Sequence, residues 1–229
     1  MIELTQVSKH FHEGQPNEVV AVRNVSLHLP AGQVTVLQGP SGSGKTTLLT
    51  LIGCLARPTQ GRVLLRGRLL SGLPEAHLAQ VRRQTFGFVF QRFNLIQGLS
   101  TLHNVMLPAY PLGPPHAELV ARARDVMAGL GLSARESTRV ELLSGGEMQR
   151  AAIARALIND PAIVIADEPT ANLDSALTRQ FLDIVAELKA RGKTLILSSH
   201  DPRITGAAEV DHVVQMADGR VLAGGVAPP

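Results

Sequence analysis

The sequence contains few of the residues that mark several functional classes. Cys54 is the single cysteine in 229 residues, so no internal disulfide can form, as expected of a reducing compartment. Aromatic residues make up 3% of the chain, so Leu, Val, Ile and Ala must build most of the core. No apolar run approaches the ~20 residues of a membrane-spanning helix, and the N-terminus lacks the apolar stretch of a signal peptide. A membrane role would therefore need a separate partner.

The sequence also lacks a strong charge of either sign. Lys and Arg number 22 against 19 Asp and Glu, which gives a net charge of +3. The basic residues are scattered, whereas a nucleic-acid binder would gather them into a patch or stripe. We therefore expect no nucleic-acid partner.

Apolar periodicity predicts alternating strands and helices. Strands are predicted at 2–7, 19–22, 25–29, 34–38, 62–65, 162–166, 194–198 and 213–216, and helices at 45–55, 78–83, 119–130, 147–158 and 175–190. This alternation favours an α/β fold with a mostly parallel core sheet. From about 92 to 159 the pattern is helical with little strand signal, which indicates an inserted helical subdomain.

A phosphate-binding loop follows the predicted strand at 34–38 and precedes a predicted helix. Glycines allow the backbone to curl so that N–H groups point at phosphate oxygens, and the helix N-terminus adds positive charge. Lys45 is expected to reach the β- and γ-phosphates, and the Thr46 hydroxyl to bind Mg²⁺. The predicted ATP-binding residues of this loop are Gly39, Ser41, Gly42, Ser43, Gly44, Lys45, Thr46 and Thr47.

Two adjacent acids, Asp167 and Glu168, end the predicted strand at 162–166. Asp167 fits the acid that binds Mg²⁺ in phosphate-loop enzymes. Glu168 would then orient or deprotonate the attacking water. Taken alone, the pair could be a solvated strand end, but a phosphate loop upstream favours the catalytic interpretation.

A second anion site is predicted in the run Leu143 to Arg150. Ser144 and Glu147 form a capping box at the start of a helix. Gly145 and Gly146 would leave N–H groups exposed at that helix N-terminus, where an anion can bind. The sequence leaves open whether this site and the phosphate loop meet on one triphosphate.

Together these motifs resemble the ATPase subunits of ATP-binding cassette (ABC) transporters, most closely the lipoprotein-release and macrolide-export group. The resemblance runs from about residue 2 to 223. Matching stretches are Gly53-Cys54-Leu55, Phe88-Val89-Phe90-Gln91, Phe93-Asn94-Leu95, Asn104-Val105, Leu143 to Arg150 and Ala166-Asp167-Glu168-Pro169-Thr170. It implies one phosphate-loop NTPase domain over 1–229, with an N-terminal antiparallel β subdomain. Residues 1–91 and 160–229 would form the nucleotide-binding lobe, and about 92–159 the helical subdomain.

The resemblance also implies a homodimer in which two chains bind head to tail around two ATP molecules. Ser144 and Gly146 of one chain would contact the γ-phosphate held by Lys45 of the other. Gln91 matches a residue that senses Mg²⁺ and the γ-phosphate, His200 a residue that contacts the γ-phosphate, and Phe11 an aromatic that stacks on adenine. Each has a structural alternative: a polar strand end, a structural histidine and a packed edge aromatic. Asn172-Leu173-Asp174 matches a loop that links the two sites.

The implied function is the ATP-hydrolysing subunit of a membrane transporter that exports or extracts its substrate. Such a subunit would lie on the cytoplasmic face of the inner membrane, bound to a transmembrane permease. Phe93, Leu95 and Ile96 would line the docking groove or belong to the subdomain core. The alternatives are an ATPase of a cell-division or signalling complex at the membrane, and a soluble ATPase acting on DNA or ribosomes. ABC-type DNA-repair proteins carry a long coiled coil between the phosphate loop and the run that corresponds to Leu143 to Arg150, whereas here that segment is short and lacks heptads. Translation factors of this type carry two cassettes in one chain, and this chain has one.

Overall fold

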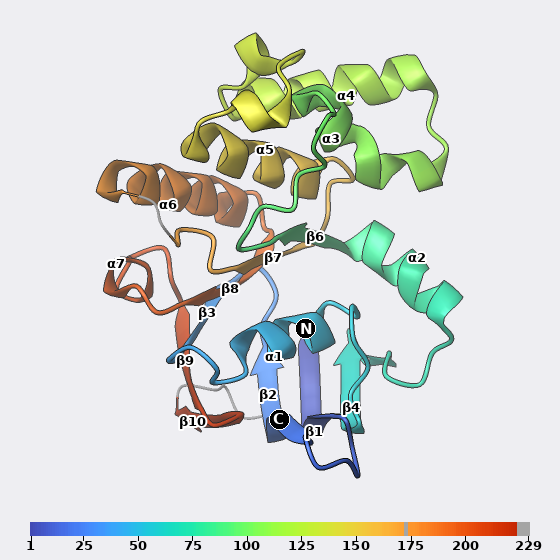
Figure 1. The fold of residues 1–229 in the computed structure, drawn as a ribbon, viewed down its shortest axis with the longest axis vertical. Helices are drawn as coiled ribbons and strands as arrows, with labels where there is room; N and C mark the ends of the chain where they lie inside the picture. Colours follow the sequence, from blue (N-terminus) through green and yellow to red (C-terminus); the bar gives the residue numbers. More distant parts are fainter. Residues whose placement is uncertain (172–173, 224–229) are drawn as a thin grey trace.

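The computed structural model describes residues 1–171 and 174–223 and contains two β-sheets (Figure 1). The N-terminal sheet is antiparallel, with the strand order β2-β1-β4-β5. Its strands are β1 (Ile2–Phe11), β2 (Val19–Leu29), β4 (Gln60–Leu65) and β5 (Arg68–Leu69).

The core sheet has the order β10-β9-β3-β8-β7-β6, and every neighbouring pair is parallel except β10 with β9. Its strands are β3 (Val34–Gln38), β6 (Phe86–Val89), β7 (Ile163–Asp167), β8 (Thr194–Ser199), β9 (His212–Ala217) and β10 (Arg220–Ala223). The predicted α/β fold with a mostly parallel core sheet is confirmed. Strands β3, β7 and β8 lie side by side, so their carboxyl ends share one edge of the sheet.

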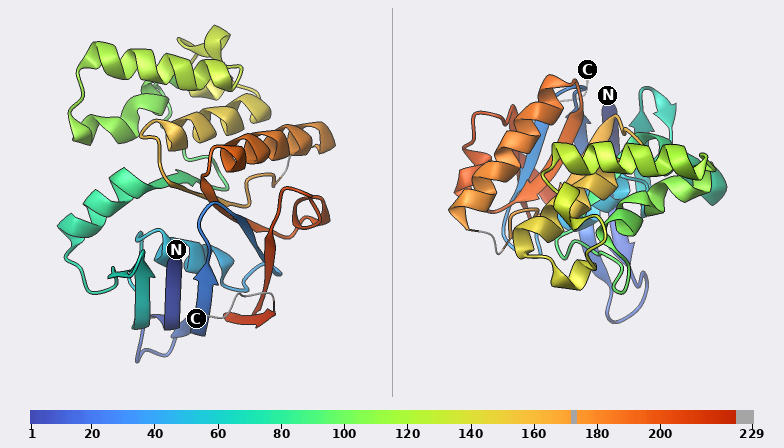
Figure 2. Two further views of the ribbon diagram at one scale, coloured as in Figure 1. Left: turned by 180° about the vertical axis from the view of Figure 1, so that it is seen from behind. Right: turned by 90° about the horizontal axis from the view of Figure 1, so that it is seen from above.

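Helices cover both faces of the core sheet (Figures 1 and 2). Helix α1 (Lys45–Ile52) contacts β7, β8 and β2, and therefore joins the core sheet to the N-terminal sheet. Helix α6 (Ser175–Ala190) packs on the other face, beside α5 (Gly145–Leu157). The remaining elements are α2 (Glu75–Thr85), α3 (Thr101–Met106), η1 (Leu107–Leu112), α4 (His116–Gly129), η2 (Ser133–Arg135), η3 (Val140–Leu142) and α7 (Pro202–Thr205).

Successive side chains of the central strands point to opposite faces of the core sheet, so they belong to two separate core clusters. In β7, Ile163 and Ile165 pack with α1 and the N-terminal sheet, whereas Val164 and Ala166 pack toward α4 and α6. Because both faces are covered, β7 is apolar almost throughout, as expected of a central parallel strand. Cys54 is buried in the first of these two clusters. Within the described ranges, no helix is long and apolar enough to cross a membrane.

Several element boundaries differ from the predictions. Helix α1 ends at Ile52 instead of Leu55, because Cys54 turns into the left-handed region with φ 59°. The two strands predicted at 19–22 and 25–29 form one strand, β2, in which Asn24 has φ 48°. Strand β6 was not predicted as an element, although it delivers Gln91 to the site. Asn172 and Leu173 of the predicted linking loop lie outside the described residues.

Candidate active site

The phosphate loop connects β3 to α1, and its glycines are required by geometry. Gly42 and Gly44 have φ of 80° and 96°, a region that side chains disfavour. A Cβ at Gly44 would lie 2.4 Å from the carbonyl oxygen of Ala21, and one at Gly39 would lie 2.2 Å from that of Met216. At Gly44 and Gly39 the loop is therefore folded tightly against β2 and β9, with no room for a side chain.

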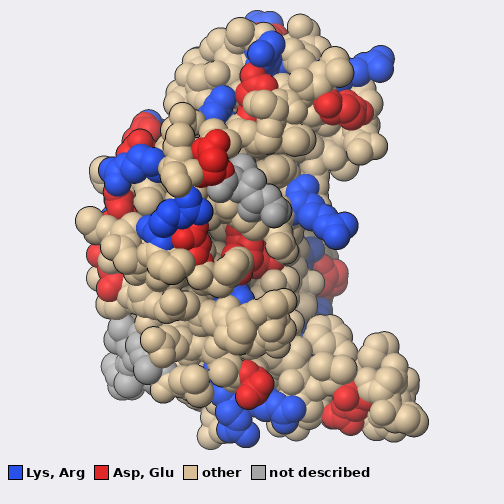
Figure 3. Space-filling model, turned by 60° about the vertical axis from the view of Figure 1, so that its left-hand side comes forward, with Lys and Arg blue, Asp and Glu red and all other residues tan. Residues whose placement is uncertain are grey.

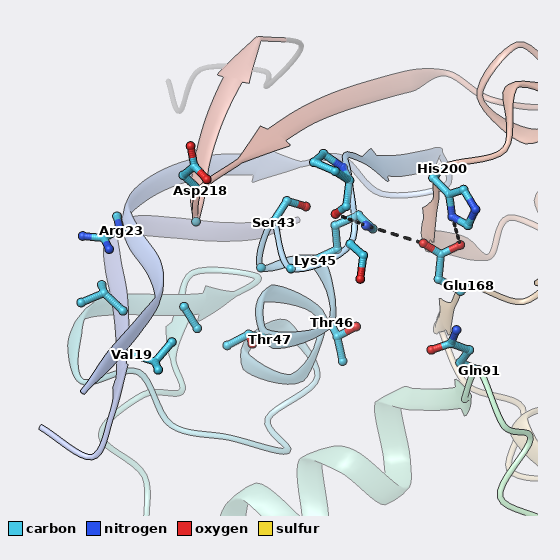
Figure 4. A pocket seen from close by; sticks show the side chains of 17 residues that line it. Val19, Arg23, Ser43, Lys45, Thr46, Thr47, Gln91, Glu168, His200 and Asp218 are labelled. Carbon is cyan, nitrogen blue, oxygen red and sulfur yellow. Dashed lines mark hydrogen bonds and ion pairs between the residues drawn. The ribbon is translucent and has the colours of Figure 1, made fainter. Parts of the chain in front are cut away.

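Lys45 begins α1 and is buried at the bottom of this loop (Figure 4). Its Nζ donates hydrogen bonds to the carbonyls of Gly39, at 2.7 Å, and Pro40, at 3.0 Å. The same Nζ lies 3.6 Å from Glu168 Oε1. The ammonium is thus held within the loop by neutral acceptors and one carboxylate.

Asp167 ends β7 and joins three elements through its carboxylate. Thr46 Oγ1, on α1, donates to Asp167 Oδ2 at 2.8 Å. Ser198 Oγ, on the neighbouring strand β8, donates to Asp167 Oδ1 at 2.6 Å and accepts from the N–H of Glu168 at 2.9 Å. Ser198 is fully buried and was not predicted as a site residue. The sequence could have indicated Ser198, because it is a polar residue at the end of a predicted parallel strand, and the ends of such strands share the sheet edge where Asp167 lies.

Glu168 follows β7 and has a strained backbone. Its φ is 45°, unusual for a residue with a side chain, and the side chain is largely buried. Its Oε2 lies 3.0 Å from His200 Nδ1, at the end of β8, and its Oε1 faces Lys45. Strain of this kind is commonly stored at functional sites.

Lys45, Thr46, Glu168 and His200 line a pocket of about 550 Å³ (Figure 4). Gln91, just beyond β6, lies at its edge together with Glu168 and His200. The structure also brings in residues that the sequence analysis missed, from β2 and from the turn between β9 and β10. They are Val19, Val20, Ala21, Arg23, Asp218 and Gly219. A single Arg or Val in an alternating strand carries no recognisable signal.

Phe11 is not among the residues that line this pocket. It pairs with Val19, which does line the pocket, across the β1–β2 ladder. Phe11 is 41% exposed, and Lys9 Nζ lies 5.3 Å from the centroid of its ring. Phe11 therefore lies beside the pocket, with Lys9 over one face of the ring.

The second predicted anion site lies at the start of α5 and does not reach this pocket. Ser144 caps the helix: its Oγ accepts from Glu147 N–H at 3.3 Å, and Glu147 Oε2 accepts from Ser144 N–H at 2.8 Å. The capping box is therefore confirmed. The Ser144 N–H, together with Arg135 and the Ser144 hydroxyl, lowers the pKa of Glu147 to about 2. Among the described residues, neither Ser144, Gly145 nor Gly146 lines the pocket at Lys45.

The three residues proposed for either a docking groove or the subdomain core differ in burial. Phe93 and Leu95 are partly buried against the larger core cluster, whereas Ile96 is 51% exposed. A separate groove of about 290 Å³ lies close by. It is lined mainly by Leu55, Arg82, Arg83, Phe86, Phe88, Phe90, Pro108, Pro111, Arg155 and Asn159.

The pocket residues fit a triphosphate with a bound divalent cation. Ser43 Oγ is buried in the loop and has no hydrogen-bond partner among the described residues, so it could serve an anion. Residues 1–171 and 174–223 contain no cluster of three or more His, Cys, Asp or Glu side chains that could hold a metal. A cation at Thr46 and Asp167 would therefore share its coordination with phosphate oxygens, as Mg²⁺ commonly does.

On the face shown in Figure 3, Lys and Arg are interspersed with Asp and Glu.

Comparisons with known proteins agree with this geometry. The family model described as ABC transporter matches residues 22–171. The macrolide export ATP-binding/permease protein MacB of Hyphomonas neptunium is 43% identical over 222 residues, 97% of this chain and 34% of that protein. This chain thus spans about a third of the length of the curated relatives it matches.

Two solved structures share the whole architecture. A dimeric structure of MJ0796, a bacterial ABC transporter cassette, is 37% identical with a TM-score of 0.90, and covers 98% of this chain and 97% of that chain. A second dimeric structure of MJ0796, in a post-hydrolysis state bound to ADP and Pi, is 36% identical with the same TM-score and coverage.

Proposed function

Since this chain belongs to the ABC transporter family, as one of its ATPase cassettes, we propose that it powers a membrane transporter by binding and hydrolysing ATP. One observation carries the proposal. Lys45, Thr46, Glu168 and His200 come from three separate parts of the chain and line one pocket, and Asp167 is bonded to Thr46.

The phosphate loop binds the triphosphate. The backbone N–H groups of residues 41–47 and the N-terminus of α1 face the phosphates, and Lys45 exchanges its loop carbonyls for β- and γ-phosphate oxygens. Phe11 stacks on the adenine with the ring face away from Lys9. Thr46, Asp167 and Gln91 hold Mg²⁺, which when bound neutralises charge on the phosphate oxygens.

Glu168 acts as the general base. Its carboxylate accepts a proton from the attacking water, and its position is fixed by the Ser198 hydroxyl at its backbone N–H and by His200 at Oε2. Because Nδ1 of His200 is used by Glu168, we assign Nε2 of that ring to the γ-phosphate. When Nζ of Lys45 leaves Glu168 Oε1 for the phosphate oxygens, the Glu168 carboxylate becomes free to bind the attacking water.

Two chains form each complete site. Ser144, Gly145 and Gly146 present a capped helix N-terminus with no phosphate of its own chain, so we assign it to the γ-phosphate held by Lys45 of a second copy. The dimeric structures of MJ0796 support this arrangement. We propose residues 92–159 as a helical subdomain that transmits closure of the dimer.

The membrane partner is a transmembrane permease, and the cassette lies on the cytoplasmic face of the inner membrane. Support comes from relatives named as combined ATP-binding and permease proteins, of which this chain matches about a third. We assign docking to the apolar groove at Leu55, Phe88 and Phe90, next to the Gln91 loop.

The substitution Glu168→Gln tests the catalytic assignment. Removing the base should lower kcat at least about a hundredfold and leave the Kd for ATP nearly unchanged. With turnover blocked, ATP should convert the variant to a dimer in size-exclusion chromatography. Glu118→Gln, on the exposed face of α4, is the matched control. Turnover at the wild-type rate would remove Glu168 from the mechanism, and a monomer under saturating ATP would contradict the shared site.

The substitution Ser144→Ala tests the assignment of the second anion site to the partner. It should lower kcat without weakening ATP binding by the monomer, because Ser144 does not line its own chain's pocket. A large loss of monomer affinity would place Ser144 in the site of its own chain.

A further inference from the structure

Arg155 is a buried cation that the mechanism above does not use. It lies on α5 and is 9% exposed. Burial lowers the pKa of its guanidinium, and no acidic group of the described residues counteracts that shift. A buried charge is costly unless polar partners compensate it, so the partners of Arg155 indicate what the residue is for.

Those partners are two consecutive backbone carbonyls in the loop after Gln91. Arg155 Nη1 donates to the oxygen of Asn94 and Nη2 to the oxygen of Phe93, both at 2.5 Å. Charge-assisted bonds from both arms of a planar guanidinium fix position and direction, which a single donor cannot do.

The segment held by Arg155 has a strained backbone. Phe93 and Asn94 have φ of 58° and 48°, and they are the one adjacent pair of non-glycine residues with positive φ in the described part of the chain. An aromatic residue in this region requires tertiary contacts that enforce it. Arg155 supplies such a contact at the carbonyls of both residues.

The same turn presents Gln91 to the pocket. The N–H of Phe93 donates to the oxygen of Phe90 at 2.8 Å, which closes a turn around Gln91 and Arg92. Gln91 lines the nucleotide pocket, and Arg155 lines the apolar groove on the other side of this turn. Arg155 also lies eleven residues after Ser144 on the same helix, about 16 Å along its axis.

We propose that Arg155 is a positioning residue for ATP hydrolysis, which holds the turn that carries Gln91 and ties it to the helix that carries Ser144. The inference rests on the function proposed for Gln91. Through this clamp, any displacement of α5 or of a group in the groove moves Gln91 relative to Thr46 and Asp167. The clamp acts on alignment and not on nucleotide affinity, because Lys45 and the phosphate loop are on other elements.

The test uses Arg155→Lys in the full chain. Lysine keeps the charge but has one donor nitrogen in place of the two guanidinium nitrogens, so it cannot fix both carbonyls in the same orientation. We therefore expect kcat to fall about tenfold while KM for ATP changes less than about twofold. In a Gln91→Ala background the same substitution should have no further effect on kcat, since both act through one side chain. If the two substitutions together lower kcat by the product of their separate effects, the proposal is overturned.

Hydrogen exchange provides a readout that does not depend on catalysis. The amide of Phe93 should exchange at least about tenfold faster in Arg155→Lys than in wild type. The matched control is Arg122→Lys, an α4 arginine whose Nη1 approaches the carbonyl of Ile158 at 3.5 Å, and it should change neither kcat nor this amide. Unchanged exchange at Phe93 in Arg155→Lys refutes the clamp. If the wild-type chain does not hydrolyse ATP, the proposed function fails while the exchange result still decides the clamp.

A second variant covers the case in which Arg155→Lys does not fold. Arg155→Gln removes the buried charge and leaves no acid unpaired. Its thermal unfolding midpoint should therefore lie closer to that of wild type than the midpoint of Arg155→Lys does. The glutamine side chain is shorter and lacks the charge and the paired nitrogens of the guanidinium, so it should reproduce the loss of kcat and the faster exchange. Wild-type values of both in a folded Arg155→Gln would overturn the proposal.

Discussion

Replacing Ser198 with alanine should weaken both the fold and the proposed magnesium site. The Ser198 hydroxyl is fully buried between Asp167 Oδ1, to which it donates at 2.6 Å, and the N–H of Glu168, from which it accepts at 2.9 Å. Alanine removes one charge-assisted bond and leaves one buried N–H without an acceptor. Each loss is worth about 1–3 kcal/mol, so we expect a decrease of about 3 kcal/mol in the free energy of unfolding.

The matched control is the next residue of the same strand. Ser199 is as buried as Ser198, but its side chain accepts a single bond, from the N–H of Asp201 at 3.1 Å. Ser199→Ala should therefore lower the free energy of unfolding by about 1 kcal/mol. Because the chain has no tryptophan, urea unfolding is best followed by circular dichroism.

The second assay is the Mg²⁺ dependence of ATP hydrolysis. Loss of a group that orients a metal ligand commonly lowers metal affinity about 10–100-fold, so Ser198→Ala should raise the half-saturating Mg²⁺ concentration by about tenfold or more. Ser199→Ala should leave it unchanged. Equal losses of stability in the two variants, together with an unchanged Mg²⁺ midpoint in Ser198→Ala, would refute the reasoning.

Three further predictions concern the cap of α5, the phosphate loop and the groove. Glu147→Gln should destabilise the chain by about 1 kcal/mol above pH 5. Because the folded pKa of Glu147 is lowered to about 2, the difference from wild type should shrink as pH falls from the ordinary carboxyl range toward pH 2, measured by thermal unfolding. Gly44→Ala should cost about 2–4 kcal/mol and abolish ATP binding, because its Cβ would lie 2.4 Å from the Ala21 carbonyl at φ 96°. Leu55→Glu should prevent co-purification with the transmembrane permease proposed as the partner, while the isolated cassette still hydrolyses ATP.

Each of these has an outcome that would contradict it, and two have a control variant in the same chain. A difference between Glu147→Gln and wild type that stays constant down to pH 2 would contradict the proposed network at Ser144. Gly42→Ala, whose Cβ meets nothing within 4 Å, should cost about 1–2 kcal/mol, and an equal loss in Gly44→Ala would contradict the steric argument. Leu69→Glu is the control for the groove, since both leucines are 44% exposed and Leu69 lies on β5. Normal co-purification of Leu55→Glu would exclude docking at this groove.

The local motifs could be predicted because their chemistry depends on neighbours in sequence. The glycines of the phosphate loop, the capping box at Ser144 and the α6 boundaries at Ser175 and Ala190 all follow from short-range rules. Helix α1 was predicted three residues too long, because the left-handed turn at Cys54 is set by packing and not by propensity. Strand β6 was missed because four residues between a helix and a loop carry little periodic signal.

The sequence by itself determined the kind of chemistry: a loop for phosphates, two acids at a strand end and a capped helix with exposed glycines. Only the tertiary structure decided which groups meet. Parallel packing of β7 and β8 brings Ser198 and His200 to Asp167 and Glu168, about 30 residues away in the chain. Packing of α5 against β6 buries Arg155 against the turn of Gln91, while Ser144 at the start of α5 lies outside the Lys45 pocket. Residue type sets what a side chain can bind, but distances between remote segments depend on how sheets and helices pack.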